Sequence, residues 1–134
     1  MTKAAPSLVP WGVDYKSRIP NAALNETFVA AARSAGLDPA LPTGPGRASS
    51  DFGDVSRLVP AAHLYFRIAK QDAPGHSPEF ARAAGSAFAI EQTLRVAEAM
   101  AVCGHRFLTE PAFRKEVRAA FRARKQRLTA DARR

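Results

Sequence analysis

The spacing of apolar residues predicts a helix in each half of the chain. After Asn21, a residue suited to cap a helix, apolar side chains recur at spacings of four, three and four, and Gly36 provides a stop. The face so formed consists of Leu24, Phe28, Ala31 and Ala35.

A longer helix is predicted from about Ala83 to Cys103, ended by Gly104. It carries two neighbouring apolar stripes. The first consists of Ala87, Ile90, Leu94, Ala97 and Ala101, and the second consists of Ala89, Val96, Met100 and Cys103. A face that wide is typical of a helix packed against a sheet.

A last helix is predicted from about Glu110 to Arg127, with Thr109 as its cap and Pro111 in its first turn. Its apolar face contains Phe113, Val117, Ala120 and Phe121, which we interpret as packing residues. The segments before and between the helices are rich in proline and glycine, so residues 1–20, 37–50 and 71–80 are predicted to be irregular. Residues 51–58 are compatible with a short helical turn before Pro60.

One segment has the alternation of a strand. Between Ala61 and Ile68, apolar residues occupy one side, and the more polar His63, Tyr65 and Arg67 occupy the other. A lone strand cannot satisfy its own backbone hydrogen bonds, and the chain scarcely supplies partner strands. The predicted fold is therefore α/β, mostly helical in this chain with one strand that needs partners from elsewhere.

The charge of the chain is concentrated at one end. The formal net charge is +8, but residues 111–134 contain nine Lys and Arg against Glu116 and Asp131, whereas residues 1–110 are nearly neutral. This leaves open a basic helical module that binds nucleic acid or an acidic partner. The generic helical spacing of the arginines and the lack of aromatic residues suited to stacking argue against nucleic acid.

The single cysteine, Cys103, excludes an intrachain disulfide, and its apolar neighbours indicate a small buried residue rather than a reactive thiol. No apolar run approaches the roughly 20 residues that span a bilayer, and the N-terminus lacks the apolar core of a secretion signal. We therefore expect a cytoplasmic protein without a membrane partner.

Three short motifs, in order, carry the chemistry. They are Ser49-Ser50-Asp51-Phe52-Gly53-Asp54-Val55-Ser56, then Val59-Pro60 with the strand, then Gly75-His76-Ser77-Pro78-Glu79-Phe80. In order and spacing they resemble the C-terminal part of the zinc aminoacylase and carboxypeptidase group, metallopeptidase family twenty. The closest branch is that of aminobenzoyl-glutamate hydrolases and β-alanyl dipeptidase-like amidohydrolases. The resemblance runs from about Tyr15 to Phe121, and Ile19–Leu24 fits the segment where the family's lid domain returns to the catalytic domain.

The resemblance implies a mixed-sheet catalytic domain with two zinc ions, of which His76 ligates one. Imidazole is a good zinc ligand, and a loop bounded by prolines can hold it with little loss of entropy. The stretch Ala48-Ser49-Ser50-Asp51 corresponds to the substrate end of the family's site, with Ala48 and Ser50 where the family has glycine and threonine. Ser50 and Asp51 are expected either beside the substrate or behind the metal ligands, and Asp51 is expected to accept hydrogen bonds rather than to bind metal.

The family's other essential residues are not found in this sequence. The family needs an H-x-D motif, a bridging aspartate and an adjacent glutamate pair that holds the catalytic base, but His63, His76 and His105 begin no H-x-D and no two glutamates are adjacent. The resemblance thus implies a fragment with no catalytic residue of its own, inactive alone and unable to bind zinc tightly. Its partner is expected to be the missing N-terminal half or a complementing chain, and a homo-oligomer stays open. Residues 1–20 are interpreted as a lead-in from a missing lid domain, 21–128 as the C-terminal part of the catalytic domain and 129–134 as a basic tail.

Each of these residues also has a plain structural interpretation. His76 is otherwise a loop histidine, His63 a sheet histidine, and His105 a residue just past a helix end. Asp51 and Asp54 are spaced like helix caps. At the level of function, three hypotheses follow: part of an amidohydrolase acting on an N-acyl amino acid or dipeptide, a basic binding module, and a remnant without function whose exposed apolar face drives self-association.

Overall fold

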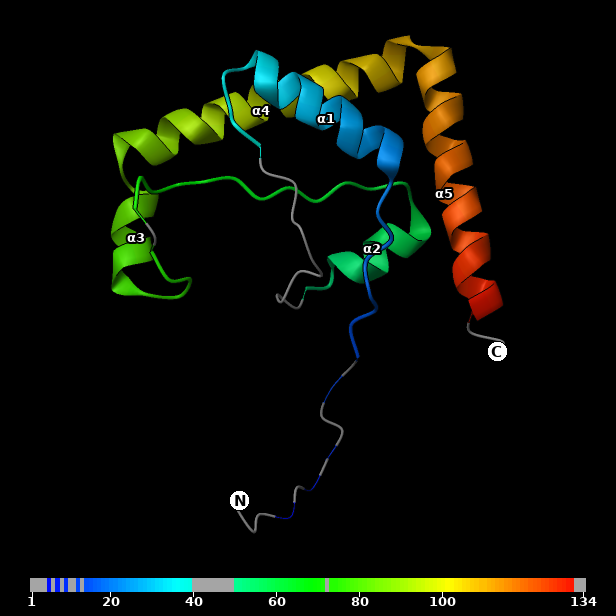
Figure 1. The fold of residues 1–134 in the computed structure, drawn as a ribbon, viewed down its shortest axis with the longest axis horizontal. Coiled ribbons are helices and arrows are strands. Elements are labelled where there is room, and N and C mark those ends of the chain that lie inside the picture. Colours follow the sequence, from blue (N-terminus) through cyan, green and yellow to red (C-terminus); the bar gives the residue numbers. More distant parts are fainter. Residues whose placement is uncertain are drawn as a thin grey trace.

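The computed structural model describes residues 14–39, 50–71 and 73–131, together with the single positions 5, 7, 9 and 12. Within these residues the chain forms five helices and no strand. The helices are α1 (Ala22–Ser34), α2 (Phe52–Leu58), α3 (Pro78–Ala84), α4 (Ala87–Thr109) and α5 (Pro111–Asp131). In Figure 1, α1 lies along the long helix α4, α5 descends from one end of α4, and α3 hangs from its other end. None of the described helices is long and apolar enough to cross a membrane.

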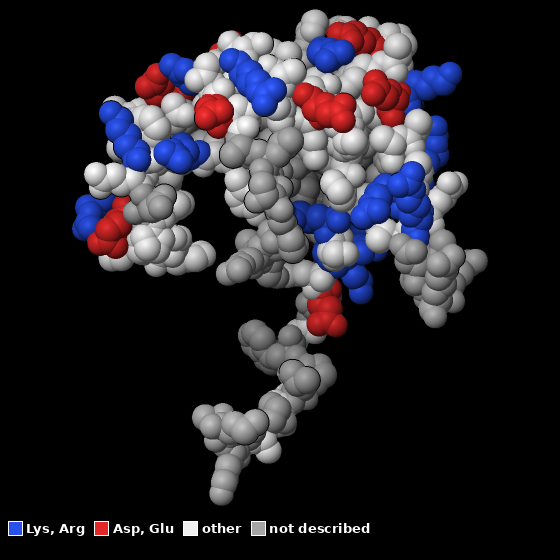
Figure 2. Space-filling model, viewed as in Figure 1, with Lys and Arg blue, Asp and Glu red and all other residues white. Residues whose placement is uncertain are grey.

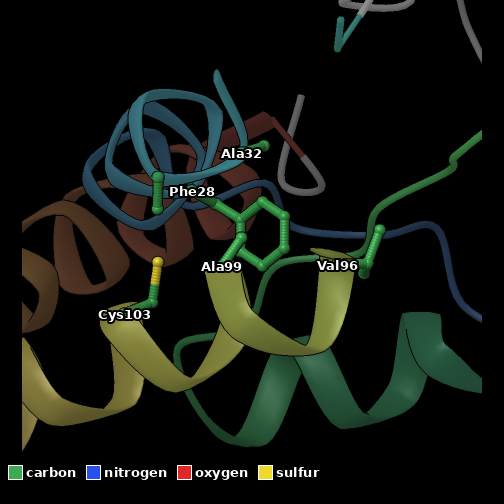
Figure 3. Packing of buried hydrophobic residues seen from close by; sticks show 6 residues of the cluster. Phe28, Ala32, Val96, Ala99 and Cys103 are labelled. Carbon is green, nitrogen blue, oxygen red and sulfur yellow. The ribbon is translucent and has the colours of Figure 1, made fainter. Parts of the chain in front are cut away.

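The main core lies between α1 and α4 (Figure 3). Phe28, Ala31 and Ala32 of α1 pack against Val96, Ala99 and Cys103 of α4. Ala32 and Ala99 are almost fully buried, and their small side chains let the two helix backbones approach closely. Arg95 of α4 donates to the carbonyl oxygens of Ala35 and Gly36 at 3.3 and 2.9 Å, which satisfies acceptors at the C-terminal end of α1.

A second, smaller core joins the start of α1 to α5. Ala23 packs with Phe113 and Val117, and the guanidinium of Arg106 lies 4.7 Å from the centre of the Phe113 ring. Asn21 connects the same elements through both ends of its amide. Its Oδ1 accepts from the backbone N–H of Leu24 at 3.1 Å, as predicted for the helix cap, and its Nδ2 donates to the carbonyl of Val117 at 2.9 Å.

Replacement of Asn21 by alanine is expected to destabilise the protein by about 2 kcal/mol, because it removes a helix cap and a buried hydrogen bond together. Asn21 is 1% exposed, so water cannot replace either partner. Asn21→Ser is the matched control, since serine keeps a capping oxygen but loses the donor to α5. Chemical unfolding of the three proteins should rank them wild type, Asn21→Ser, Asn21→Ala in decreasing stability. Equal stability of wild type and Asn21→Ala would show that the bridge between α1 and α5 contributes nothing.

The boundaries of the predicted helices need three corrections. The helix predicted to begin near Ala83 is divided into α3 and α4, because Ser77 and Ser86 each cap a helix, accepting from the backbone N–H of Phe80 at 3.1 Å and of Ala89 at 3.2 Å. The short α3 therefore begins inside the predicted loop. Gly104 does not end α4, which continues to Thr109, so His105 lies within the helix and not beyond it. Thr109 is the last residue of α4 rather than the cap of α5, and its hydroxyl donates to the carbonyl of His105 at 2.8 Å.

The wide apolar face predicted for this helix is only half covered. Ala89, Val96 and Cys103 of the second stripe are buried, but Met100 is 59% exposed. On the first stripe Ile90 and Leu94 are 55% and 66% exposed, because no described element packs on them. Cys103 is buried as predicted, and burial raises the pKa of its thiol, an effect that the charge of Arg106 partly opposes.

The predicted strand is the main error in the fold prediction. Residues 60–69 form no helix or strand, and their backbone makes no hydrogen bond to another described residue. The segment passes below α4 in Figure 1, and Leu64 packs against the core between α1 and α4. Alternation is partly kept, since Leu64 faces the core while His63 and Tyr65 are exposed. The ladder is missing because the described residues offer no neighbouring strand, so a mixed sheet is not confirmed.

Candidate functional site

His76 is presented on a strained turn immediately before α3. Its φ angle is 61°, in the left-handed region that residues other than glycine rarely adopt. The turn is fixed from the helix side, where Ser77 caps α3, Pro78 occupies its first turn, and Glu79 pairs with Arg82 at 2.8 Å. The side chain of His76 is exposed. A costly backbone conformation that holds an exposed imidazole is the kind of strain found at functional sites.

The described residues do not complete a metal site around His76. No group of three or more His, Cys, Asp or Glu side chains that could hold a metal ion is found among them. A catalytic zinc ion requires about three protein ligands. His76 is therefore a single candidate ligand among the described residues, and zinc binding stays a prediction.

Ser50 and Asp51 lie at the start of α2. Ser50 Oγ accepts from the backbone N–H of Phe52 at 3.1 Å and donates to Asp51 Oδ1 at 3.4 Å. The carboxylate of Asp51 makes no capping hydrogen bond and is exposed. The carboxylate of Asp54 accepts instead from the backbone N–H of Lys16 at 3.4 Å. Asp51 thus occupies the predicted N-cap position of α2 without a side-chain capping bond, Asp54 lies in the first turn and not at a cap, and the Asp51 carboxylate is left available as an acceptor.

Residues 16–19, within the segment predicted to be a lead-in, are held on α2 by a small buried junction. Ser56, which is fully buried, accepts from the backbone N–H of Ile19 at 2.9 Å and donates to the carbonyl of Gly53 at 2.7 Å. Arg57 donates to the carbonyl and hydroxyl oxygens of Ser17 at 3.2 and 2.9 Å. These contacts fix residues 16–19 beside α2, and with them the position of Arg18.

Arg18 joins two side chains of the extended segment into a group that sequence reasoning missed. One guanidinium nitrogen lies 3.0 Å from His63 Nδ1 and donates to the Tyr65 hydroxyl at 3.2 Å. The rings of His63 and Tyr65 stack with centroids 4.9 Å apart, and Phe52 of α2 lies 4.7 Å from His63. Alternation placed His63 and Tyr65 on one face, but no pattern in the sequence connects them to Arg18, 45 residues upstream of His63.

This group, Arg18 with His63 and Tyr65, offers hydrogen-bond donors of the kind that recognise an oxyanion. Arginine only donates, so Nδ1 of His63 is the acceptor and the neutral ring carries its proton on Nε2. Partial desolvation of the mostly exposed ring, and then the charge of Arg18, lower the pKa of His63, which favours that neutral form. The group therefore offers the outer N–H groups of Arg18, the Nε2–H of His63 and the Tyr65 hydroxyl. None of the ion pairs between described residues neutralises Arg18.

Replacement of Arg18 by glutamine is expected to raise the pKa of His63 toward 6.5, the ordinary value, because it removes the second of the two causes of the lowered pKa. In the wild type, the pKa of His63 is lower in the folded protein than in the unfolded chain, so the unfolded chain binds the proton more readily. The contribution of His63 to the free energy of unfolding is therefore present above pH 6.5, the ordinary pKa, and is lost as the pH falls through the lower pKa of the folded protein. The NMR titration of the His63 ring measures the shift. Arg82→Gln, on α3, is the control that should leave it in place. An unchanged His63 pKa in Arg18→Gln contradicts the contact.

The structure does not bring the predicted site residues together. Ser50 and Asp51 precede α2, whereas His76 precedes α3, and these two short helices are separated along the length of α4 in Figure 1. The extended segment connects them. In the part of the chain that is described, the candidate residues thus lie in two separate groups, one beside α2 and one beside α3, and do not form one closed active site.

Basic side chains form one group near α2 and α5. Figure 2 shows this group, while along α1 and α4 basic and acidic residues are interspersed. On α5, Phe113 and Val117 are buried, but the cations from Arg122 to Arg127 are all exposed. The second half of α5 is therefore a solvated basic helix, and the binding-module hypothesis stays a prediction.

Comparison with known proteins finds sequence similarity to peptidases. The chain is 36% identical over 117 residues to the Xaa-Arg dipeptidase of Mus musculus, which covers 84% of this chain and 27% of that protein. It is 32% identical over 117 residues to the Xaa-Arg dipeptidase of Homo sapiens, covering 84% of this chain and 26% of that protein. The chain therefore spans about a quarter of the length of these curated relatives. No family model and no solved structure matches it.

These homologues support a relationship to peptidases, in agreement with the resemblance seen in the motifs. They do not distinguish the branch within that group. The similarity covers most of this chain but a minor part of each relative, so it concerns one portion of a dipeptidase rather than a whole one.

Proposed function

We propose that this chain is the C-terminal portion of a metal-dependent amidohydrolase that hydrolyses the amide bond of a dipeptide or an N-acyl amino acid, and that it is inactive alone. The observation that carries the proposal is the 36% identity to a dipeptidase along 84% of the chain. The described residues hold no group of three metal ligands, so the activity depends on residues from elsewhere. The partner is the remaining portion of the enzyme, in the same or a complementing chain.

In this proposal His76 is the metal ligand that the chain contributes to a site with two zinc ions. Its exposed position on a left-handed turn supports the assignment, because the imidazole is free to meet ligands from another segment. When bound, zinc supplies Lewis-acid activation of water and of the scissile carbonyl. The capped α3 holds the ligand in place through Ser77 and Pro78.

Ser50, Asp51 and the Arg18 group are proposed to lie on the substrate side. A dipeptide ends in a carboxylate, and Arg18 with His63 and Tyr65 offers several donors around a positive charge that no described carboxylate pairs with. Ser50 orients Asp51 by a hydrogen bond and leaves one carboxylate oxygen free to accept from the substrate.

A chimera tests the proposal. The matched 117 residues of the mouse Xaa-Arg dipeptidase would be replaced by the corresponding residues of this chain. We expect hydrolysis of a dipeptide that ends in arginine, lost on chelation of metal and restored by zinc, while the isolated chain shows none. A folded chimera that binds zinc yet cleaves no dipeptide contradicts the proposal.

A further inference from the structure

The α5 helix carries a row of positive charges on one face, which we call the basic stripe. It consists of Lys115, Arg118, Arg122 and Lys125. The spacing of three, four and three residues places these side chains on one side of the helix, over about 15 Å of its length. All four are exposed, and their face is turned away from Phe113 and Val117, which pack in the smaller core.

The charges of the basic stripe are not balanced by carboxylates among the described residues. The ion pairs found there lie within α3, within α4 and at the residue that follows α4, and none includes a cation of α5. Cations three or four residues apart on a helix repel each other, so the stripe by itself destabilises α5. Arg114 differs, because it donates to the carbonyls of Phe107 and Leu108 at 3.0 and 2.6 Å. That arginine stabilises the end of α4, whereas the stripe is available to an anionic partner.

One edge of the basic stripe is apolar. Phe121 and Leu128 are half-buried, and the ammonium of Lys125 lies 5.7 Å from the centre of the Phe121 ring. A partner helix with carboxylates three and four residues apart has charges at the same intervals as the stripe, and its apolar side chains can contact Phe121 and Leu128. Nucleic acid fits less well, because phosphates offer no apolar counterpart and the half-buried Phe121 is not an exposed platform for stacked bases.

We propose that the basic stripe of α5 binds an acidic amphipathic helix of a partner protein. Figure 2 shows basic side chains at the surface near α5, where such a helix has access to them. The affinity falls with increasing salt, because exposed ion pairs are screened. The interaction does not depend on the proposed hydrolysis, since no residue of the stripe belongs to either group of candidate site residues.

Binding of a synthetic acidic helix to the isolated chain tests the proposal. The patterned peptide, about four turns long, carries glutamates at alternating intervals of three and four residues beside an apolar face. A peptide of the same composition in scrambled order keeps the charge and loses the pattern. Isothermal titration calorimetry measures both affinities. We expect the patterned peptide to bind about 10-fold more tightly than the scrambled one, and less tightly at about 200 mM than at about 50 mM salt.

Two double variants with equal loss of charge locate the site. Arg118→Gln with Arg122→Gln removes two charges of the stripe and is expected to weaken binding of the patterned peptide by about 10-fold. Arg124→Gln with Arg127→Gln removes two charges of α5 outside the stripe and should weaken binding by less than about 2-fold. All four side chains are exposed, so both variants should keep the helix content of the wild type, which circular dichroism measures.

The alternative outcomes are distinct. Equal affinity for the patterned and scrambled peptides, or an equal loss in the two double variants, indicates attraction by net charge alone and overturns the proposal. Tighter binding of a DNA duplex of about 20 base pairs than of the patterned peptide, at about 150 mM salt, assigns the stripe to nucleic acid and also overturns it. A wild-type chain that binds no patterned peptide excludes the stripe as a docking surface for an acidic helix. Because the isolated chain is measured and nothing is hydrolysed, none of these results depends on the chimera.

Discussion

In the chimera with the mouse dipeptidase, His76→Ala is expected to lower hydrolysis of a dipeptide ending in arginine by at least about 100-fold and to reduce bound zinc. The reason is that a catalytic zinc ion has few protein ligands, and loss of one weakens both its affinity and its geometry. His76 is exposed and makes no hydrogen bond to another described side chain, so its removal should cost the fold little. Zinc content by elemental analysis and the initial rate are the two measurements.

Two control variants distinguish the loss of a zinc ligand from damage to the turn that contains His76. His105→Ala removes an exposed histidine from α4 and should leave zinc and rate unchanged. His76→Gly should relieve the strain of a positive φ at that position, so it should fold at least as well as wild type and still lose zinc. A His76→Ala chimera with the full zinc content and rate would remove His76 from the site.

The structure shows which local signals in the sequence are sufficient to define an element. Asn21 and Gly36 bracket α1 as predicted, because a capping side chain and a residue with positive φ act within a few positions of themselves. Ser77 and Ser86 are signals of the same kind, and as N-caps they divide the predicted long helix into α3 and α4. Gly104 shows the opposite case, since a glycine inside a helix costs only about 1 kcal/mol and packing of Phe107 continues α4 past it.

The properties that depend on distant residues could not be predicted in this way. The alternating segment Ala61–Ile68 can form a strand only beside a partner strand, and the described residues contain none. The alternation therefore indicated which side chains face the core, not the secondary structure of the segment. Arg18 meets His63 only because Ser56 and Gly53 hold the lead-in on α2, and no spacing in the sequence encodes that contact. The motifs gave His76, Ser50 and Asp51, but α2 and α3 lie apart in Figure 1, so the described residues display these side chains without bringing them together.

Gly53→Ala is expected to destabilise the protein by about 3 to 4 kcal/mol and to release the lead-in from α2. Gly53 is buried, and a Cβ at this position would overlap the carbonyl oxygen of Lys16 and lie 2.7 Å from its carbonyl carbon. The obstacle is backbone, which cannot rotate away, so either α2 or residues 16–19 must move. The hydrogen bond between Ile19 and Ser56 is then lost, and so is the position of Arg18 against His63.

Gly104→Ala is the matched control for this substitution. A Cβ at Gly104 meets nothing within 4 Å, and alanine favours the interior of α4 by up to about 1 kcal/mol, so this variant should be slightly more stable than wild type. Chemical unfolding measures both changes, and the NMR titration of His63 measures the release of Arg18, which should move the pKa of His63 up in Gly53→Ala only. A Gly53→Ala variant with the stability and the His63 pKa of the wild type would show that residues 16–19 do not pack on α2 as in the structure. Arg18 would then not be held beside His63, in the position from which it is proposed to bind the substrate.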